Sequence, residues 1–128
     1  MVVVSHISIG LNTSVLEALR VIDHGSAQIA LVVDEKKCLL GTLTDGDIRR
    51  GLLRGETLEA PVHRFMNRQF RFVCSGDDQA VVLKMMRREQ LCQIPVIDSE
   101  GCVVQVLLLN ELLAPAQLPN AGVIRAGG

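Results

Sequence analysis

Thr44 and Asp47 are the residues whose types and spacing most clearly support chemistry. They lie three positions apart, after the apolar residues 38–43 and just before Ile48, which begins an apolar stripe at helical spacing. One interpretation is a capping box, in which the Thr44 hydroxyl accepts a hydrogen bond from the Asp47 N–H and the carboxylate reaches back. A second is a nucleotide site, because a helix N-terminus favours anions, a hydroxyl suits phosphate and a carboxylate suits the two hydroxyls of a ribose. The two interpretations are compatible, since one side chain can cap a helix and contact a ligand.

Two apolar segments precede this helix and must position it. Residues 29–33 are partly β-branched and typical of a strand buried on both faces. Residues 34–37 form a polar turn, and residues 38–42 form a second short strand. The helix is then expected over about residues 45–53.

An earlier strand and helix complete this unit. Residues 2–9 alternate loosely, which predicts a short strand. Ser14 followed by Glu17 is a capping box, and Gly25 ends the helix that it begins. Residues 55–61 are a polar linker.

The pattern then repeats with an offset of 64 residues, so that Asp34 falls on Asp98 and Cys38 on Cys102. In the second copy we expect strands at residues 70–74, 94–97 and 102–108, a helix capped by Asp77 and Asp78 with Val81, Val82, Met85 and Met86 in its core, and a last helix at residues 110–113. Each copy reads β-α-β-β-α and is small for independent stability. We therefore predict an α/β (α+β) fold of two repeats, residues 1–60 and 61–114, packed face to face with pseudo-twofold symmetry.

Composition restricts the classes of protein. The chain has 128 residues, 48% of them hydrophobic, and a net charge of −1, which fits a globular protein without an electrostatic footprint for nucleic acid. Three phenylalanines are the only aromatic residues, which argues against single-stranded nucleic-acid binding. No segment reaches about 18 apolar residues, so no membrane span is expected, and residues 1–4 lack the basic start of a signal peptide.

The cysteines and histidines do not have the spacing of metal ligands. The four cysteines are scattered singles, interpreted as small buried hydrophobic residues in a reducing cytoplasm: Cys38, Cys74, Cys92 and Cys102. The three histidines are interpreted as surface or cap residues. We therefore expect no metal site, no disulfide framework and a cytoplasmic location.

The duplication and the segment at residues 41–47, Gly-Thr-Leu-Thr-Asp-Gly-Asp, together resemble a tandem pair of CBS domains over about residues 5–113. That family has a buried strand ending in a Val-Val-Asp-like turn, followed by Gly-x-x-Thr-x-x-Asp opening the last helix. Gly41, Thr44 and Asp47 match this pattern residue by residue.

The resemblance implies that AMP, ADP or ATP binds in a cleft between the repeats. Asp47 would hold the ribose 2′- and 3′-hydroxyls, Thr44 would contact phosphate, and Gly41 would let the backbone approach closely. The base would lie against the positions Ile9, Gln28, Ile29 and Ala30. Arg49 or Arg50 would neutralise a phosphate tail, at most one of them because adjacent helical residues point in different directions; alternatively, both form a solvated basic face.

The second repeat departs from the family pattern. The offset puts Gln105 at the glycine position, Leu108 at the threonine position and Glu111 at the aspartate position. Gln105 has a side chain where backbone must approach, and Leu108 has no hydroxyl. We therefore expect one competent cleft and one weak or empty cleft.

The last residues resemble a different family. Residues 123–128, Val-Ile-Arg-Ala-Gly-Gly, resemble the opening of sugar-1-phosphate nucleotidyltransferases, where an apolar strand leads into Ala-Gly-Gly-x-Gly-Thr-Arg; the alternative is a frayed tail. Residues 44–55 also resemble CBS pairs that precede the catalytic domain of such transferases. A similar Thr-Asp-Gly-Asp sequence occurs in CBS pairs that follow the catalytic domain of sugar-phosphate isomerases. We expect residues 115–128 to be a linker and the start of a truncated transferase domain.

Three functions remain open. The first is a nucleotide-sensing regulatory module without catalytic residues, which biases an attached nucleotidyltransferase. The alternative is a structural module that forms a homodimer through its helices and binds no nucleotide, with Val15, Leu19, Met85 and Met86 as candidates either for that face or for the core. A small enzyme has least support, because no nucleophile–base pair and no complete phosphate loop is present.

Overall fold

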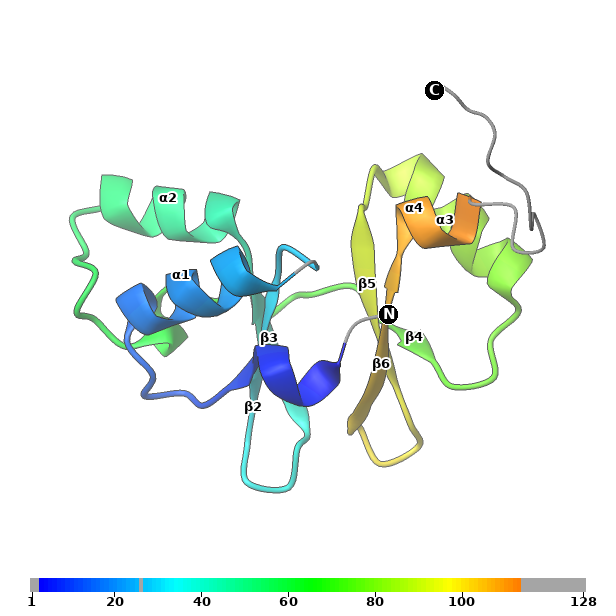
Figure 1. Ribbon diagram of the computed structural model, residues 1–128, viewed down its shortest axis with the longest axis horizontal. Coiled ribbons are helices and arrows are strands. Elements are labelled where there is room, and N and C mark those ends of the chain that lie inside the picture. Colours follow the sequence, from blue (N-terminus) through cyan, green and yellow to red (C-terminus); the bar gives the residue numbers. More distant parts are fainter. Residues whose placement is uncertain (1–2, 26, 114–128) are drawn as a thin grey trace.

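The chain folds into two three-stranded sheets with helices on their outer sides. The computed structural model describes residues 3–25 and 27–113. Strand orders are β1-β2-β3 and β4-β5-β6, and Figure 1 shows the sheets facing each other at the centre with α1 and α2 outside one and α3 and α4 outside the other. The predicted mixed α/β fold with two β-α-β-β-α repeats is confirmed. The predicted transferase start at residues 115–128 lies outside the described residues.

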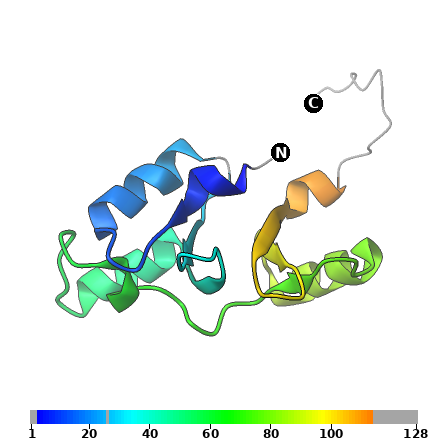
Figure 2. The same ribbon diagram turned by 90° about the horizontal axis from the view of Figure 1, so that it is seen from below.

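The two repeats have matching elements. Repeat 1 contains η1 (Val4–Ile7), β1 (Ser8–Ile9), α1 (Val15–His24), β2 (Ala30–Val33), β3 (Leu39–Leu43) and α2 (Asp45–Leu53). Repeat 2 contains β4 (Val73–Cys74), α3 (Gln79–Glu89), β5 (Gln93–Ile97), β6 (Val103–Leu108) and α4 (Leu109–Leu113). The segment between them includes the short helix η2 (Val62–Arg64) and passes from one repeat to the other, as Figure 2 shows.

The 64-residue offset also holds for strand register. Ala30 pairs with Leu43 in repeat 1, and Ile94 pairs with Leu107 in repeat 2. The antiparallel ladder shifts register after Val32 and, at the equivalent place, after Val96. The strand register therefore repeats in detail, which supports the 64-residue alignment of the two repeats.

The central strand β2 separates two cores. Ala30 and Val32 face α1 and α2 and belong to one buried cluster with Leu43 and Ile48. Leu31, from the other face of the strand, is fully buried in a second cluster that includes Val106 and Leu108 of repeat 2. Burying a side chain of this size contributes about 1.5–3 kcal/mol, so the interface between the repeats is part of what stabilises each sheet.

Two predicted strands are shorter in the structure. Only Ser8–Ile9 of the predicted strand 2–9 is extended, and Val4–Ile7 forms a 3-10 helix closed by a hydrogen bond from Ser8 Oγ to Val4 O of 2.8 Å. In the segment 70–74 only Val73–Cys74 forms a strand. Apolar alternation over so few residues does not separate a strand from an apolar turn that packs on the core.

The helices also correct two side-chain assignments. Val81 was predicted in the core of α3 but is 63% exposed, whereas Val82 and Met86 are buried. Val15 and Met86 are both fully buried, so these two candidates for a dimer face belong to the core.

The hairpin turns of the two sheets have the same hydrogen bonds. Asp34 Oδ1 accepts from the backbone N–H groups of Lys36 and Cys38, and Asp98 Oδ1 accepts in the same way from Glu100 and Cys102. The turns share the aspartate but differ at the position with positive φ. Repeat 2 has Gly101 at a φ of 86°, and repeat 1 has Lys37 at a φ of 69°, in the left-handed region that favours glycine.

Lys37→Gly is therefore expected to raise the free energy of unfolding by about 0.5–1 kcal/mol, because the left-handed conformation strains a residue with a Cβ. Urea unfolding measures the change. The neighbouring Lys36→Gly is the control and should give no gain, since Lys36 does not have a positive φ. A loss of stability in Lys37→Gly would contradict the prediction.

Candidate functional site at the start of helix α2

Thr44 and Asp47 form a reciprocal capping box at the N-terminus of α2. The Asp47 N–H donates to Thr44 Oγ1 at 3.4 Å, and the Thr44 N–H donates to Asp47 Oδ2 at 3.0 Å. The Thr44 hydroxyl also donates to that carboxylate oxygen at 3.1 Å. Because β3 ends at Leu43, the sheet fixes the position of both side chains. The capping interpretation is confirmed, and the compatible ligand role stays a prediction.

The Asp47 carboxylate has a third partner in Arg50. Arg50 Nη2 lies 2.7 Å from Asp47 Oδ1, and the Asp47 side chain is 12% exposed while that of Arg50 is 61% exposed. A carboxylate offers about four acceptor positions, so most of its capacity is already used. An incoming hydroxyl must take the remaining position or replace Arg50, whose guanidinium group can move into solvent.

Both arginines of this helix turn gather over Gly46. A methyl group added at Gly46 would lie 3.3 Å from Arg50 Nη1 and 3.8 Å from Arg49 Nη2. The argument that these adjacent residues point in different directions is therefore wrong. Helical side chains tilt toward the N-terminus, and arginine is long enough for both guanidinium groups to reach the same turn. Two positive groups thus lie beside the positive end of the helix dipole.

The space beside Gly41, where a side chain would lie, is filled by Met66 and Asn67 of the same chain. A methyl group at Gly41 would lie 2.7 Å from Met66 Sδ and 3.1 Å from Asn67 O. Asn67 also exchanges two backbone hydrogen bonds with Thr42, of 3.1 and 2.8 Å. The missing side chain of Gly41 serves this packing of the segment between repeats on β3, and a close approach of a ligand there stays a prediction.

The four residues predicted to contact the base are not brought together on one surface. Ala30 is fully buried and Ile9 is partly buried, both on the helix-facing side of the sheet. Ile29 is 4% exposed and belongs to the core between the repeats. Gln28 has a φ of 59° and borders two cavities, one of about 400 Å³ that also contacts Asp45.

The second cavity beside Gln28 lies between the two repeats. It has a volume of about 320 Å³ and is lined by residues of both repeats around the start of α4: Ala27, Gln28, Cys92, Gln93, Leu108, Leu109, Asn110 and Leu113. Leu108, the counterpart of Thr44, is 8% exposed and packs in the same buried cluster as Ile29. Gln28 and Ile29 of repeat 1 therefore face the start of α4. The cavity beside Asp45 at the start of α2 is instead lined by residues of repeat 1. The sequence analysis did not predict the contact between repeats at α4, because it placed the residues that contact the base on the same repeat as Asp47.

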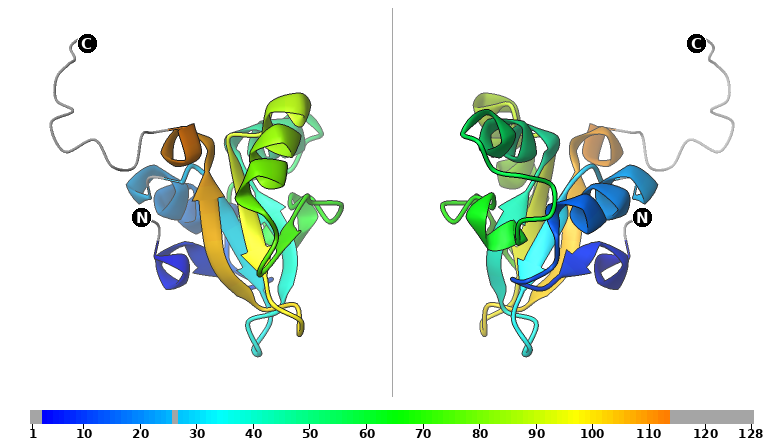
Figure 3. Two further views of the ribbon diagram at one scale, coloured as in Figure 1. Left: turned by 90° about the vertical axis from the view of Figure 1, so that its right-hand side faces the viewer. Right: turned by 90° about the vertical axis from the view of Figure 1, so that its left-hand side faces the viewer.

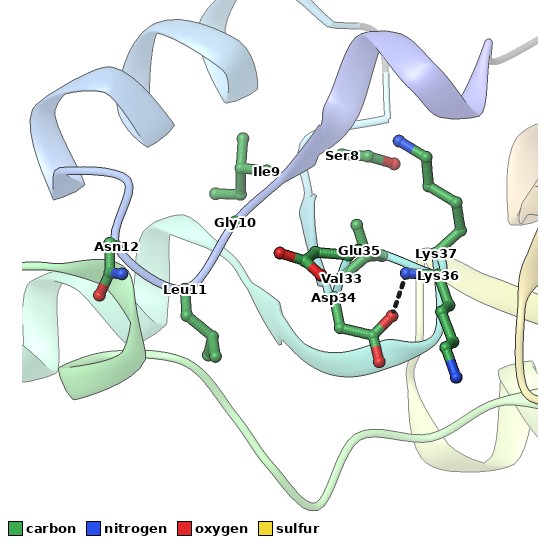
Figure 4. Close-up of a pocket in the computed structure, with 10 residues that line it drawn as sticks. All are labelled: Ser8, Ile9, Gly10, Leu11, Asn12, Val33, Asp34, Glu35, Lys36 and Lys37. Atoms are coloured by element: carbon green, nitrogen blue, oxygen red, sulfur yellow. Dashed lines mark hydrogen bonds between the residues drawn. The ribbon is translucent and has the colours of Figure 1, made fainter.

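Ile9 lines a different cavity at the opposite end of the sheet. Figure 4 shows this open cavity of about 690 Å³, between residues 8–12 and the turn residues 33–37. Since Ala30 pairs with Leu43 at the α2 end of β2, the turn that follows Val33 lies far along the strand from Thr44. The cavity that Ile9 lines does not include Thr44 or Asp47.

The family model for the CBS domain matches this chain twice, at residues 3–54 and 62–114. The chain belongs to the CBS-domain family. Its two CBS domains are the two repeats described above, which confirms the family resemblance seen in the sequence. The predicted domain limits at residues 60 and 114 stay predictions.

Relatives and solved structures carry the same CBS pair in different proteins. The chain is 28% identical over 102 residues to arabinose 5-phosphate isomerase GutQ of Salmonella typhimurium, covering 79% of this chain and 32% of the isomerase. The cytosolic domain of the Mg²⁺ channel MgtE in complex with ATP has a TM-score of 0.73 and 24% identity, covering 88% of this chain and 46% of that one. CBSX2 in complex with AMP has a TM-score of 0.72 and 19% identity, covering 82% of each chain. The chain spans 24% to 34% of the length of the curated relatives that it matches.

Residues 3–25 and 27–113 lack a membrane-spanning helix and a cluster of metal-ligating side chains. Within these ranges no helix is long and apolar enough to span a bilayer. The same ranges contain no group of three or more histidine, cysteine or acidic side chains placed to hold a metal ion.

Proposed function

We propose that this CBS pair is a regulatory module that binds AMP, ADP or ATP at the start of α2, in the cleft between the repeats. The observation that carries the proposal is the constellation at one helix N-terminus: the Thr44 hydroxyl, the Asp47 carboxylate and the guanidinium groups over Gly46. Two solved CBS pairs of the same fold were crystallised in complex with ATP and AMP.

Each group has a separate task in the bound state. The Asp47 carboxylate accepts hydrogen bonds from the ribose hydroxyls, and the Thr44 hydroxyl donates to a phosphate oxygen. A ribose hydroxyl at Oδ1 displaces Arg50 from its 2.7 Å contact. The released guanidinium group, and that of Arg49 beside it, then pair with phosphate, and charge-assisted bonds of this kind are among the strongest in proteins. Gly41 holds the preceding strand in place.

The base lies against repeat 2. Ile29 and Gln28 of repeat 1 lie near Leu108 and Leu109 at the start of α4. By the 64-residue offset we propose the equivalent arrangement at the start of α2, with Cys92 and Gln93, which also line the cavity at α4, on the side of Thr44 and Asp45. Gln93 already reaches across the interface, where its Nε2 donates to Gln28 O at 3.3 Å. We therefore assign the base side of the Asp47 cleft to Cys92 and Gln93 in place of Ile9 and Ala30.

The second cleft has a buried leucine, Leu108, at the position of Thr44. Leu108 buries its side chain where a phosphate-binding hydroxyl would stand, and Gln105 is exposed. A phosphate there would lose hydration without gaining a hydroxyl partner, which costs free energy. We therefore propose one nucleotide per chain, bound at Asp47.

Binding between the repeats can change their relative angle and so act on an attached enzyme, by as much as the affinity differs between two states. We propose a sugar-1-phosphate nucleotidyltransferase as that enzyme, supported by the Ala-Gly-Gly resemblance at residues 126–128. The similarity to arabinose 5-phosphate isomerase GutQ, 28% identical over 102 residues, is compatible with a sugar-phosphate enzyme of another kind. We place the module in the cytoplasm as a homodimer formed through helices.

Thermal unfolding with AMP, ADP and ATP tests the proposal, with GTP and S-adenosylmethionine as comparison ligands. A ligand at a hundred times its Kd stabilises by about 2.7 kcal/mol, which raises Tm by about 10 °C for a chain of this size. We expect this rise with at least one adenosine nucleotide. A dimer whose Tm responds to none of them would instead support the structural module that binds no nucleotide.

A further inference from the structure

The two hairpin tips meet on the pseudo-twofold axis through a pair of cysteines. Cys38 precedes β3 and Cys102 precedes β6, and these equivalent residues form an isolated antiparallel bridge with each other. Figure 3 shows the two hairpin tips side by side, away from the helices. All four cysteines were predicted to be buried, which is wrong: Cys74 and Cys92 are exposed, and Cys38 and Cys102 are half-buried with free thiols.

The hydrogen bond beside the bridge defines the type of pair. Leu39 N donates to Gly101 O at 3.1 Å, a bond from the residue after one cysteine to the residue before the other. Such bonds flank a non-hydrogen-bonded pair, in which the Cα atoms are about 4.5 Å apart and the side chains are closest. A disulfide needs Cα atoms about 4.4–6.8 Å apart, so the backbone already has a spacing that a disulfide can span.

The thiols are placed symmetrically at this contact. Cys38 Sγ donates to Glu100 O at 3.6 Å and Cys102 Sγ donates to Lys36 O at 3.3 Å, which are equivalent carbonyls in the two turns. Desolvation, then the Asp98 carboxylate and the contact with Cys38, raise the pKa of the Cys102 thiol. Its proximity to Cys38, and not its acidity, therefore favours this pair over the exposed cysteines.

Both turns are braced against movement. The Asp34 carboxylate holds the Cys38 N–H at 2.9 Å, and the Asp98 carboxylate holds the Cys102 N–H at 2.9 Å. Each turn is also closed by a backbone bond, from Asp34 N to Cys38 O and from Asp98 N to Cys102 O. The two cysteines are thus presented to each other by rigid turns that need no refolding before the sulfurs join.

We propose that Cys38 and Cys102 are an oxidative cross-link site that ties the two CBS domains together. The oxidant is a low-molecular-weight disulfide, R–S–S–R. One cysteine thiolate attacks it, forms a mixed disulfide and releases one RS⁻; the second thiolate then attacks the protein sulfur, forms the Cys38–Cys102 bond and releases the other RS⁻. The two thiols lose two protons and two electrons, and the small disulfide is reduced to two thiols.

The cross-link closes a loop between residues 64 positions apart. A disulfide over so long a loop restricts the unfolded chain strongly, so oxidation should raise Tm by about 10 °C if the native geometry accepts the bond. The bond also fixes the two domains to each other at the hairpin end, opposite the helix starts.

The test uses the full chain with Cys74→Ser and Cys92→Ser, which leaves only the two bridge cysteines, incubated with oxidised glutathione. We expect mass spectrometry to find a monomer that has lost two hydrogen atoms, with the peptides of Cys38 and Cys102 linked, and a Tm about 10 °C above that of the reduced chain. Adding Cys38→Ser should leave a glutathione adduct on Cys102 and no rise.

Two outcomes would overturn the cross-link site. Glutathione adducts on both cysteines, or disulfides between two chains, would show that the thiols do not reach each other in the native fold. An internal disulfide that leaves Tm unchanged or lowers it would show that the bond forms only through distortion.

Discussion

Gly51→Ala is expected to lower the free energy of unfolding by about 2–3 kcal/mol, and Tm by about 10 °C. Gly51 lies inside α2, where alanine would ordinarily stabilise a helix by about 1 kcal/mol. An added methyl group, however, would overlap the ring of Phe65, which is 5% exposed and packs in the core of repeat 1. Because an aromatic ring in a packed core cannot move aside without strain, steric overlap outweighs the gain in helix propensity.

Gly10→Ala is the matched control, since a methyl group there would meet no atom within 4 Å and Gly10 has no positive φ. Its free energy of unfolding should change by no more than about 0.5 kcal/mol. Urea unfolding of both variants measures the difference. A Gly51→Ala variant as stable as Gly10→Ala would contradict the packing of Phe65 on α2.

Asp47→Ala is expected to weaken adenosine-nucleotide binding by more than about a hundredfold. Each hydrogen bond from a ribose hydroxyl to a carboxylate contributes about 1.5–3 kcal/mol, and the variant loses both. It also removes half of the capping box, so it should cost about 1 kcal/mol of stability without ligand. The two effects must be separated, because a destabilised chain could bind less nucleotide for a purely structural reason.

Ser14→Ala separates them. Ser14 caps α1 by accepting a hydrogen bond from the Glu17 N–H at 3.2 Å, and it has no proposed ligand role. Its loss should lower stability by a similar amount and leave the nucleotide Kd unchanged. If both variants lost binding equally, Asp47 would act only as a cap.

The features that follow from local pattern were predicted well. The 64-residue duplication gave the element order of both repeats, and the spacing of Thr44 and Asp47 gave the capping box. The elements within each copy and the capping box depend on residues close in sequence, where helical and extended periodicity determine which side chains meet.

The features that depend on packing between the repeats were not predicted. Gln28 and Ile29 lie near Leu108 because the second sheet faces the first. Neither the residue types nor their spacing predicts this contact between the repeats. The guanidinium groups of Arg49 and Arg50 both lie near Gly46 because the side chains are long. The prediction that they point in different directions considered only the angle between adjacent residues on a helix.

The central claim is one nucleotide site per chain at Asp47, and isothermal titration calorimetry tests it most directly. AMP, ADP and ATP are titrated into the wild-type chain and into Asp47→Ala. The predicted result is a stoichiometry of one for at least one of these nucleotides, with heat that is lost in Asp47→Ala. Binding of unchanged affinity in Asp47→Ala, or no heat with any of the three, would contradict it.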